Sequence, residues 1–309
     1  MIDRYDRIPT ELRKAILEVN SIKGRKYDTS SQQLMKMYES VTYWDLLSEE
    51  WFGRVNCYTH SSSEVIILRK FIKNSKGVRV ILGMLNGREV VVKSINSTRH
   101  TIKDETSVYQ SLKEDGCQVP WFRSDFFFWG QPVLVLEKLQ PLDEYDDEFK
   151  LGREIIRQLE YVHEFGCHSD IKPQNIMKRV TKKGHKKICQ YFLIDYGGVA
   201  SERLDHGYKR WIWTHKWTSQ KPHAQGPERV ITCTNDFVEL AYVMRAIQIW
   251  RSRHRSKLPK DKDGDFRTGY KGRLLKFMEA VCDGSESDHA YLRSLLRGTS
   301  GSHRRMNKD

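Results

Sequence analysis

His168-Ser169-Asp170-Ile171-Lys172-Pro173-Gln174-Asn175 is the stretch that decides the fold, and Phe192-Leu193-Ile194-Asp195-Tyr196-Gly197 follows it further along the chain. The first stretch places a lysine two residues after Asp170 and an asparagine five residues after it. A carboxylate can orient a hydroxyl proton, and a lysine can neutralise a transferring phosphoryl group. An asparagine and a second aspartate can hold metal ions. We therefore predict a phosphoryl-transfer site with Asp170 as the catalytic base, Lys172 beside the phosphoryl group, and Asn175 and Asp195 as metal ligands.

The two stretches, in this order, resemble the catalytic loop and the metal-binding loop of the eukaryotic protein kinases. The resemblance implies an α+β, two-lobed fold with a small β-rich N-lobe that carries one key helix and a larger, mainly helical C-lobe. It also implies ATP and Mg²⁺, and a serine/threonine protein kinase that transfers the γ-phosphate to protein hydroxyls. Tyr196, together with the segment 214–219, is similar to the casein kinase 1 and vaccinia-related kinase branch. A viral origin is a further hypothesis.

The resemblance extends to the nucleotide site. Val90-Val91-Val92-Lys93 resembles the strand whose lysine holds the α- and β-phosphates. Glu105, on a helix twelve residues later, is its expected ion-pair partner, with Asp104 as the alternative if the helix register differs by one residue. The other nucleotide-binding positions that the resemblance implies are Gly77 and Val80 in the phosphate loop, and the backbone of Glu137 and Leu139 at the adenine.

The phosphate loop departs from the family. Where three glycines are expected, Lys73-Asn74-Ser75-Lys76-Gly77-Val78-Arg79-Val80 retains one, Gly77. Backbone amides approach phosphates most closely where no Cβ intervenes, so this loss weakens the prediction of turnover. The alternative is a pseudokinase that acts as a nucleotide-binding scaffold or a partner-binding module. All six catalytic positions are nevertheless filled, and we therefore favour the enzyme.

The periodicity of apolar residues divides the chain into four parts. We predict an N-terminal helical extension over residues 1–65, an N-lobe over 66–140, a C-lobe over 141–297, and a disordered basic tail over 298–309. Asn86-Gly87 predicts a tight hairpin between strands at 78–85 and 88–95, because both turn positions need positive φ. The other predicted elements are helices over 97–112, 149–165 and 237–250, strands over 126–128 and 133–136, and further helices within 277–296. The resemblance implies that Asp236 braces the backbone of the catalytic loop. A plain helix N-cap is the other interpretation of Asp236, and the two are compatible.

Composition limits the partners. The chain has 309 residues, a net charge of +13 and 39% hydrophobic residues, and no apolar run approaches the length of a bilayer. Six scattered cysteines indicate a reducing, intracellular compartment, either nucleus or cytoplasm. The charge favours an acidic protein substrate, and the basic stretch 251–276 is a second candidate, for nucleic acid. A solvated basic surface without a specific partner explains the charge equally well. We predict no membrane association.

Overall fold

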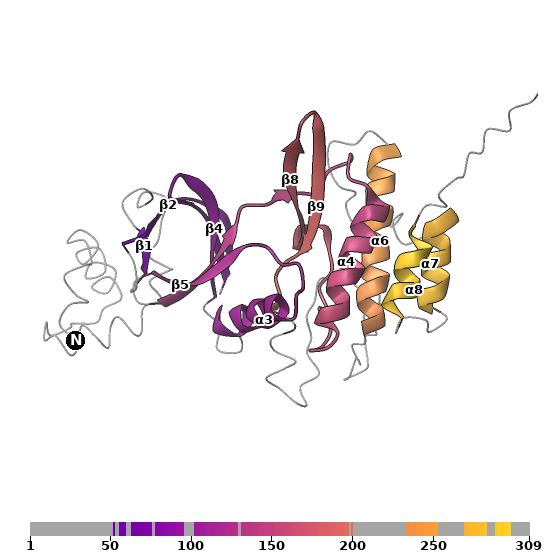
Figure 1. The fold of residues 1–309 in the computed structure, drawn as a ribbon, viewed down its shortest axis with the longest axis horizontal. Coiled ribbons are helices and arrows are strands. Elements are labelled where there is room, and N and C mark those ends of the chain that lie inside the picture. Colours follow the sequence, from indigo (N-terminus) through magenta and orange to yellow (C-terminus); the bar gives the residue numbers. More distant parts are fainter. Residues whose placement is uncertain are drawn as a thin grey trace, which may run out of the picture. The chain divides into compact units, whose positions relative to one another are not determined.

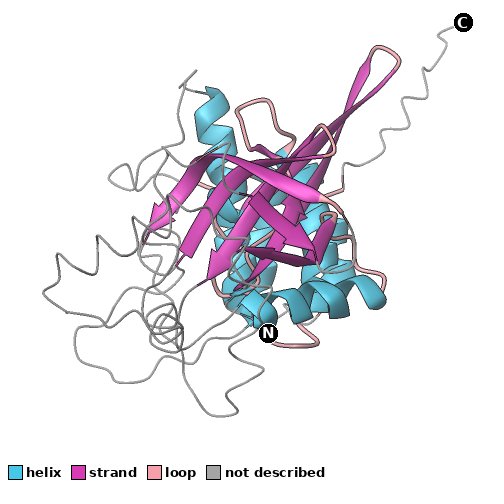
Figure 2. Ribbon diagram, turned by 90° about the vertical axis from the view of Figure 1, so that its left-hand side faces the viewer, coloured by secondary structure: helices cyan, strands magenta, loops and turns pink. Residues whose placement is uncertain are grey.

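The computed structural model describes residues 52, 56–59, 63–75, 78–95, 102–128, 131–197, 199, 233–252, 269–282 and 288–297. Backbone contacts divide the chain into two units. Unit 1 comprises residues 1–103 and 121–138, and unit 2 comprises residues 104–120 and 139–309. Figure 1 colours the elements by their position in the sequence, and Figure 2 colours them by type.

Unit 1 is a closed antiparallel barrel with the strand order β1-β2-β3-β4-β6-β5. Its strands are β1 (Asn56–Thr59), β2 (Val65–Ser75), β3 (Val78–Leu85), β4 (Arg88–Ile95), β5 (Phe122–Phe128) and β6 (Gln131–Glu137). Alternate residues of these strands point inward and form the core of the barrel, which includes Ile66, Leu68, Ile81, Val92, Phe126 and Val135.

The β3–β4 hairpin confirms the prediction from Asn86-Gly87. Leu85 pairs with Arg88, so Asn86 and Gly87 alone make the turn, with φ angles of 49° and 77°. Such a turn is favoured in hairpins because its own backbone twist matches the right-handed twist of the flanking strands. The hairpin sets the register along β4, and Val80 therefore lies opposite Lys93.

Two boundaries differ from the prediction. Asn56–Thr59, assigned to a helical extension, form strand β1, which closes the barrel by pairing with both β2 and β5. Residues 104–120 group with unit 2 and not with the β-rich part. The helix predicted over 97–112 corresponds to α3 (Ile102–Glu114), and residues 97–101 lie outside the described residues. Residues 1–51, the segment 214–219 and the tail 298–309 lie outside the described residues.

Unit 2 is mainly helical. It contains most of α3, with α4 (Glu148–Val162), α6 (Cys233–Ser252), α7 (Gly272–Cys282), α8 (His289–Leu295) and a three-stranded sheet of β7 (Gln140–Pro141), β8 (Ile176–Lys183) and β9 (Lys186–Leu193). Helix α4 packs against α6, α8 and β9, and α7 packs against α6 and α8 (Figure 1). The side chain of Asp147 caps α4 by accepting hydrogen bonds from the backbone N–H groups of Phe149 and Lys150.

The described chain is therefore mixed α/β, with a β-rich unit and a mainly helical unit, as the sequence predicts in outline. The closure of the six strands into a barrel was not predicted. Among the helices that the structure describes, none combines the length and apolar character that a bilayer crossing requires.

Candidate functional site

The side chain of Asp170 is held by two residues of its own loop. Lys172 Nζ lies 2.5 Å from Asp170 Oδ2, and Asn175 Nδ2 donates to the same oxygen at 2.9 Å. Asn175 Nδ2 also donates to the backbone carbonyl of Asp170 at 2.9 Å. The chain can turn back in this way because Pro173 opens a one-turn 3₁₀ helix, Pro173–Asn175, and proline has the φ angle that such a turn needs. The predicted spacing of two and five residues thus brings three polar side chains together.

Two buried carboxylates of α6 support the backbone of this loop. Asp236 Oδ2 accepts from the N–H of His168 and Asp236 Oδ1 from the N–H of Ser169, both at 2.8 Å. Glu239 Oε2 accepts from the N–H of Ile171 at 3.0 Å. Ser169 has a φ of 64°, in the left-handed region that side chains other than glycine and asparagine disfavour. The bond to Asp236 helps to hold Ser169 in that conformation.

Asp195 is placed beside the loop by its neighbours in sequence. The N–H of Ile194 donates to the carbonyl of Asn175 at 2.9 Å, and Nε2 of His168 lies 3.1 Å from the carbonyl of Ile194. Asp195 itself has a φ of 68°, so the chain changes direction directly after the residue that carries these bonds. The hydroxyl of Tyr196 donates to the carbonyl of Leu193 at 3.0 Å and anchors the far side of the turn.

The donor groups of this site suit a small, hard cation. Because Asn175 Nδ2 is used by Asp170, the amide oxygen is the atom of Asn175 that could coordinate, and Asp195 would add a carboxylate. No three His, Cys, Asp or Glu side chains of the described residues lie close enough to hold a metal by themselves. Mg²⁺ is commonly bound through only one or two carboxylates, with water completing its shell. The residues present therefore fit Mg²⁺.

The remaining predicted residues are distributed over both units. Lys93 and Val80 face each other across β4 and β3 of unit 1, and Lys93 is 6% exposed. Glu137 ends β6, and its N–H donates to the carbonyl of Trp121 at 3.0 Å. Glu105 lies in the first turn of α3 and is fully buried, and Leu139 precedes β7. Gly77 lies outside the described residues.

Lys178 has a structural role. It is buried, and its Nζ lies 2.6 Å from Asp143 Oδ2 and 2.9 Å from Asp146 Oδ1. Burial lowers the pKa of Lys178, but the hydrogen bonds that it donates to these two carboxylates outweigh burial and raise the pKa. Lys178 therefore ties β8 to the segment before α4.

Sequence reasoning missed Glu239 and the surroundings of His163. Glu239 follows Asp236 by three residues on α6, so the two carboxylates share one face of the helix. That spacing could have indicated from the sequence that Glu239 lies beside Asp236. His163, at the end of α4, places Nε2 3.0 Å from Asp236 Oδ2. Nothing in the sequence indicates this pairing, because 73 residues separate the two positions.

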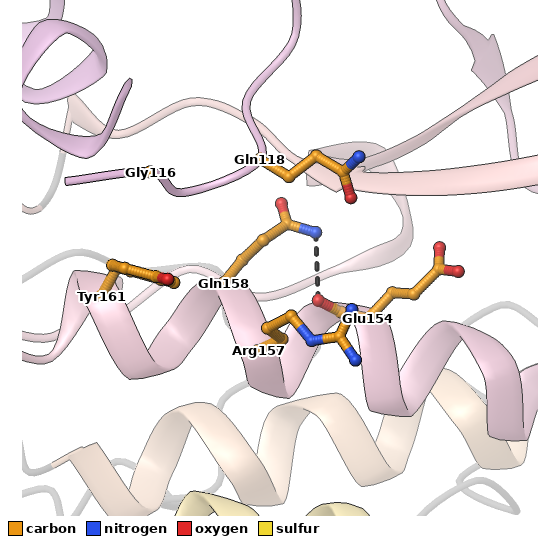
Figure 3. A pocket seen from close by; sticks show the side chains of 6 residues that line it. All are labelled: Gly116, Gln118, Glu154, Arg157, Gln158 and Tyr161. Atoms are coloured by element: carbon orange, nitrogen blue, oxygen red, sulfur yellow. Dashed lines mark hydrogen bonds between the residues drawn. The ribbon is translucent and has the colours of Figure 1, made fainter. Parts of the chain in front are cut away.

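A separate polar pocket of about 270 Å³ lies between α4 and the turn after α3 (Figure 3). It is lined by Gly116, Gln118, Glu154, Arg157, Gln158 and Tyr161. Gln158 Nε2 donates to the carbonyl of Glu154 at 3.1 Å, and Gln158 also bonds the backbone of Tyr191 and Leu193 in β9. These groups hold β9 on α4, and the pocket shares no residue with the loop at Asp170.

Comparisons with known proteins add little. No family model matches the chain, and no curated protein matches it. A crystallised kinase domain is similar over 70% of this chain and 70% of its own, with 17% sequence identity and a TM-score of 0.40. We rest the functional conclusion on the geometry of the loop and not on this likeness.

Proposed function

We propose that this chain is a serine/threonine protein kinase with the two-lobed kinase fold, using ATP and Mg²⁺. The observation that carries the proposal is the convergence on Asp170, whose carboxylate binds both Lys172 and Asn175, while Asn175 binds the residue before Asp195. An ordinary polar turn at the surface does not require buried carboxylates beneath its backbone. In this loop, by contrast, backbone N–H groups donate to the buried carboxylates of Asp236 and Glu239.

Each residue of the loop has a defined role in the proposal. Asp170 accepts or orients the proton of the attacking hydroxyl, and Lys172, already within 2.5 Å of that carboxylate, neutralises the transferring phosphoryl group. Asn175 and Asp195 hold Mg²⁺. When bound, Mg²⁺ supplies charge neutralisation between the β- and γ-phosphates. Asp236 keeps Asp170 in place through the backbone of the two preceding residues.

The nucleotide contacts form a second part of the proposal. A buried ammonium requires anionic partners, because desolvation of an unpaired charge is costly. We assign Lys93 to the α- and β-phosphates, with Glu105 as its ion-pair partner. Gly77 and Val80 would cover the phosphates, and the backbone of Glu137 and Leu139 would bind adenine.

For the substrate, we propose an acidic protein segment that docks on the β8–β9 ribbon. Four exposed lysines lie at its end, with Lys182 directly opposite Lys187 and Lys183 directly opposite Lys186. Like charges placed opposite each other on a sheet destabilise it, and residues 176–194 contain no acidic side chain to offset them. An anionic partner would remove this repulsion.

Transfer of labelled γ-phosphate by the purified full-length protein with Mg²⁺ tests the enzyme. We expect transfer by the wild type, loss of at least about 100-fold in Asp170→Asn and Lys93→Met, and no change in Asp115→Asn, a matched change at an exposed aspartate. Absence of transfer from a folded wild-type protein that binds ATP would refute the proposal.

Replacement of Lys182, Lys183, Lys186 and Lys187 by glutamine tests the docking ribbon. If each charge contributes about 0.3 kcal/mol, their sum corresponds to roughly a tenfold rise in KM for an acidic peptide, with kcat unchanged. The control is the same four positions as arginine, which keeps the charge. Unchanged KM, with loss only of oligonucleotide binding, would show instead that the ribbon binds nucleic acid.

One observation favours the pseudokinase alternative. Lys73, Asn74 and Ser75, where glycines are expected, are regular strand residues of β2 and pair with Val80, Arg79 and Val78 of β3. The hairpin thus offers little of the glycine-rich backbone that usually approaches phosphates. A rise in melting temperature with ATP, without transfer to any substrate, would support this alternative.

A further inference from the structure

Two cysteines meet directly beneath the loop that carries Asp170. Sγ of Cys167 lies 3.2 Å from Sγ of Cys233, although 66 residues separate them in sequence. Cys167 immediately precedes His168, and Cys233 is the first residue of α6, three residues before Asp236. Cys167 is buried and Cys233 is half-buried. The pair therefore connects the start of the loop with the helix that supports it.

Charged groups around the pair favour a thiolate on Cys233. His163 contacts Asp236 Oδ2 through Nε2 and His289 Nε2 through Nδ1, each at 3.0 Å, an arrangement in which a cationic imidazolium donates twice. Burial lowers the pKa of His163, but hydrogen bonds with Asp236 and Cys233 outweigh it and raise the pKa to about 9.

The same contacts act on Cys233 in the opposite direction. Its hydrogen bond with Cys167 lowers its pKa, burial raises it, and the hydrogen bond with His163 lowers it again, to a net pKa of about 5. Its place at the N-terminus of α6 acts in the same sense, because the partial positive charge of a helix N-terminus stabilises a thiolate. Cys233 is thus an activated thiol, and Cys167 lies where a second thiol would resolve its oxidised form.

We propose that Cys167 and Cys233 form a reversible disulfide that switches the loop at Asp170 between an active reduced state and an inactive oxidised state. The modifying reagent is a hydroperoxide. None of the roles assigned above to the loop uses either sulfur. The disulfide itself does not depend on phosphoryl transfer, whereas its effect on activity rests on the proposed function.

The chemistry takes two steps. In the first, the Cys233 thiolate attacks the terminal peroxide oxygen, an S–O bond forms and the O–O bond breaks. The leaving hydroxide or alkoxide is protonated to water or an alcohol. In the second, the Cys167 thiol attacks the sulfur of the Cys233 sulfenic acid, the S–S bond forms, and the S–O bond breaks. The thiol proton leaves with the hydroxyl as a second water molecule. Two thiols and one hydroperoxide thus give one disulfide, one water and one water or alcohol.

Closing the disulfide would move the two sulfur atoms, and we expect the loop to move with them. A disulfide has sulfur atoms about 2.05 Å apart, so the present 3.2 Å has to shrink by roughly 1 Å. Cys167 is joined to His168 and Ser169, whose N–H groups are fixed on Asp236, and Asp170 is the next residue. A displacement of that size in a catalytic group can cost about 100-fold in rate. We expect oxidation to lower phosphoryl transfer by at least about tenfold, with recovery on reduction.

Hydrogen peroxide titration of the full-length protein tests the site. Peptide mapping by mass spectrometry without reduction should show Cys167 joined to Cys233 in the wild type, and no such product in Cys233→Ser. At pH 6, iodoacetamide should modify Cys233 at least about tenfold faster than the exposed Cys282, because the lowered pKa of about 5 leaves Cys233 largely as thiolate. His163→Gln should slow that reaction while retaining both thiols.

The outcomes separate the two proposals. Loss of transfer on oxidation in the wild type and in the matched Cys282→Ser variant, but not in Cys233→Ser, supports the switch. Absence of the cross-linked peptide, while Cys282 is oxidised, would overturn the site. A cross-link that leaves transfer unchanged would overturn the switch and leave the proposed kinase intact. Absence of transfer by the reduced protein would overturn the kinase, whereas the cross-linked peptide would still be found.

Discussion

Replacement of Asp236 by asparagine is the sharpest perturbation that the structure suggests, because one fully buried carboxylate supports the whole loop. Its two oxygens accept from the N–H groups of His168 and Ser169 at 2.8 Å, and Oδ2 also contacts His163. Asparagine keeps the size of the side chain but has one acceptor and one donor in place of two acceptors. One of the two backbone N–H groups would then face an N–H₂ group.

The expected loss follows from these contacts. A hydrogen bond to a charged group contributes roughly 1.5–3 kcal/mol, and a buried N–H left without an acceptor costs a similar amount. Since asparagine retains one neutral bond, we expect Asp236→Asn to lower the free energy of unfolding by about 2–4 kcal/mol. For a unit of this size, that corresponds to a fall in melting temperature of roughly 5–10 °C. Ser169, at a φ of 64°, would lose its support and relax toward a common backbone region.

Two assays separate stability from function. Thermal unfolding by circular dichroism measures the first, and γ-phosphate transfer at 20 °C, below the variant's melting point, measures the second. We expect the kcat of transfer to fall about 100-fold, with a smaller change in the KM for ATP. The reason is that the substitution displaces the loop and leaves the nucleotide contacts in place. Asp115→Asn, at an exposed aspartate, serves as the control. A melting temperature within 2 °C of wild type, together with unchanged kcat, would refute the bracing role of Asp236.

Three further predictions concern single groups. Tyr196→Phe removes one buried hydrogen bond but keeps the ring, so we expect a loss of about 1 kcal/mol in thermal unfolding, compared with no loss in Tyr145→Phe on the surface. A Cβ added at Gly83 would lie 2.6 Å from an isoleucine methyl in the barrel core, and Gly83→Ala should destabilise unit 1 by roughly 1–3 kcal/mol in urea unfolding; an unchanged midpoint would contradict this. The free energy of unfolding should fall as the pH is lowered from 6.5 to 5. His163, with a pKa raised from 6.5 to about 9, stabilises fully below pH 6.5 and loses that contribution as the pH rises through 9. Cys233, with a pKa lowered from 9.0 to about 5, stabilises above pH 9 and loses that contribution as the pH falls through 5. Between pH 6.5 and 9 the folded and unfolded pairs each hold one proton, so stability is level. Below 6.5 only the unfolded pair gains a second proton, and the resulting loss should be absent from melting curves of Cys233→Ser.

Local signals predicted the parts of the fold that depend on local conformation. The turn at Asn86-Gly87 was predicted correctly, because the positive φ of its two residues is a property of those residues alone. Strand β1 was missed, because Asn56–Thr59 become a strand only by pairing with β2 and β5, and β5 lies more than 60 residues away. A strand of four residues carries too little periodicity to reveal that pairing.

In the candidate site, too, contacts within a short segment were predicted, whereas some contacts between distant segments were missed. The spacing within 168–175 was sufficient to predict that Asp170, Lys172 and Asn175 would converge, since a short loop limits how far apart they can lie. The brace from Asp236 was expected through resemblance to kinases, and the hydrogen bonds confirm the contact. Glu239 was missed, although its spacing from Asp236 places it on the same face of α6.

The thiol pair could not be predicted, because Cys167 and Cys233 are brought together only by the packing of the loop on α6. One link between this pair and the loop at Asp170 is Asp236 Oδ2, which serves both the N–H of His168 and the imidazole of His163. The Cys233 thiolate and the Asp236 carboxylate together keep His163 cationic. Oxidation removes one of these two anions, and the pKa of His163 should therefore fall. A neutral His163 binds Asp236 less strongly, so a change in the charge of a sulfur should reach the backbone that holds Asp170 even before the two sulfur atoms have closed into a disulfide.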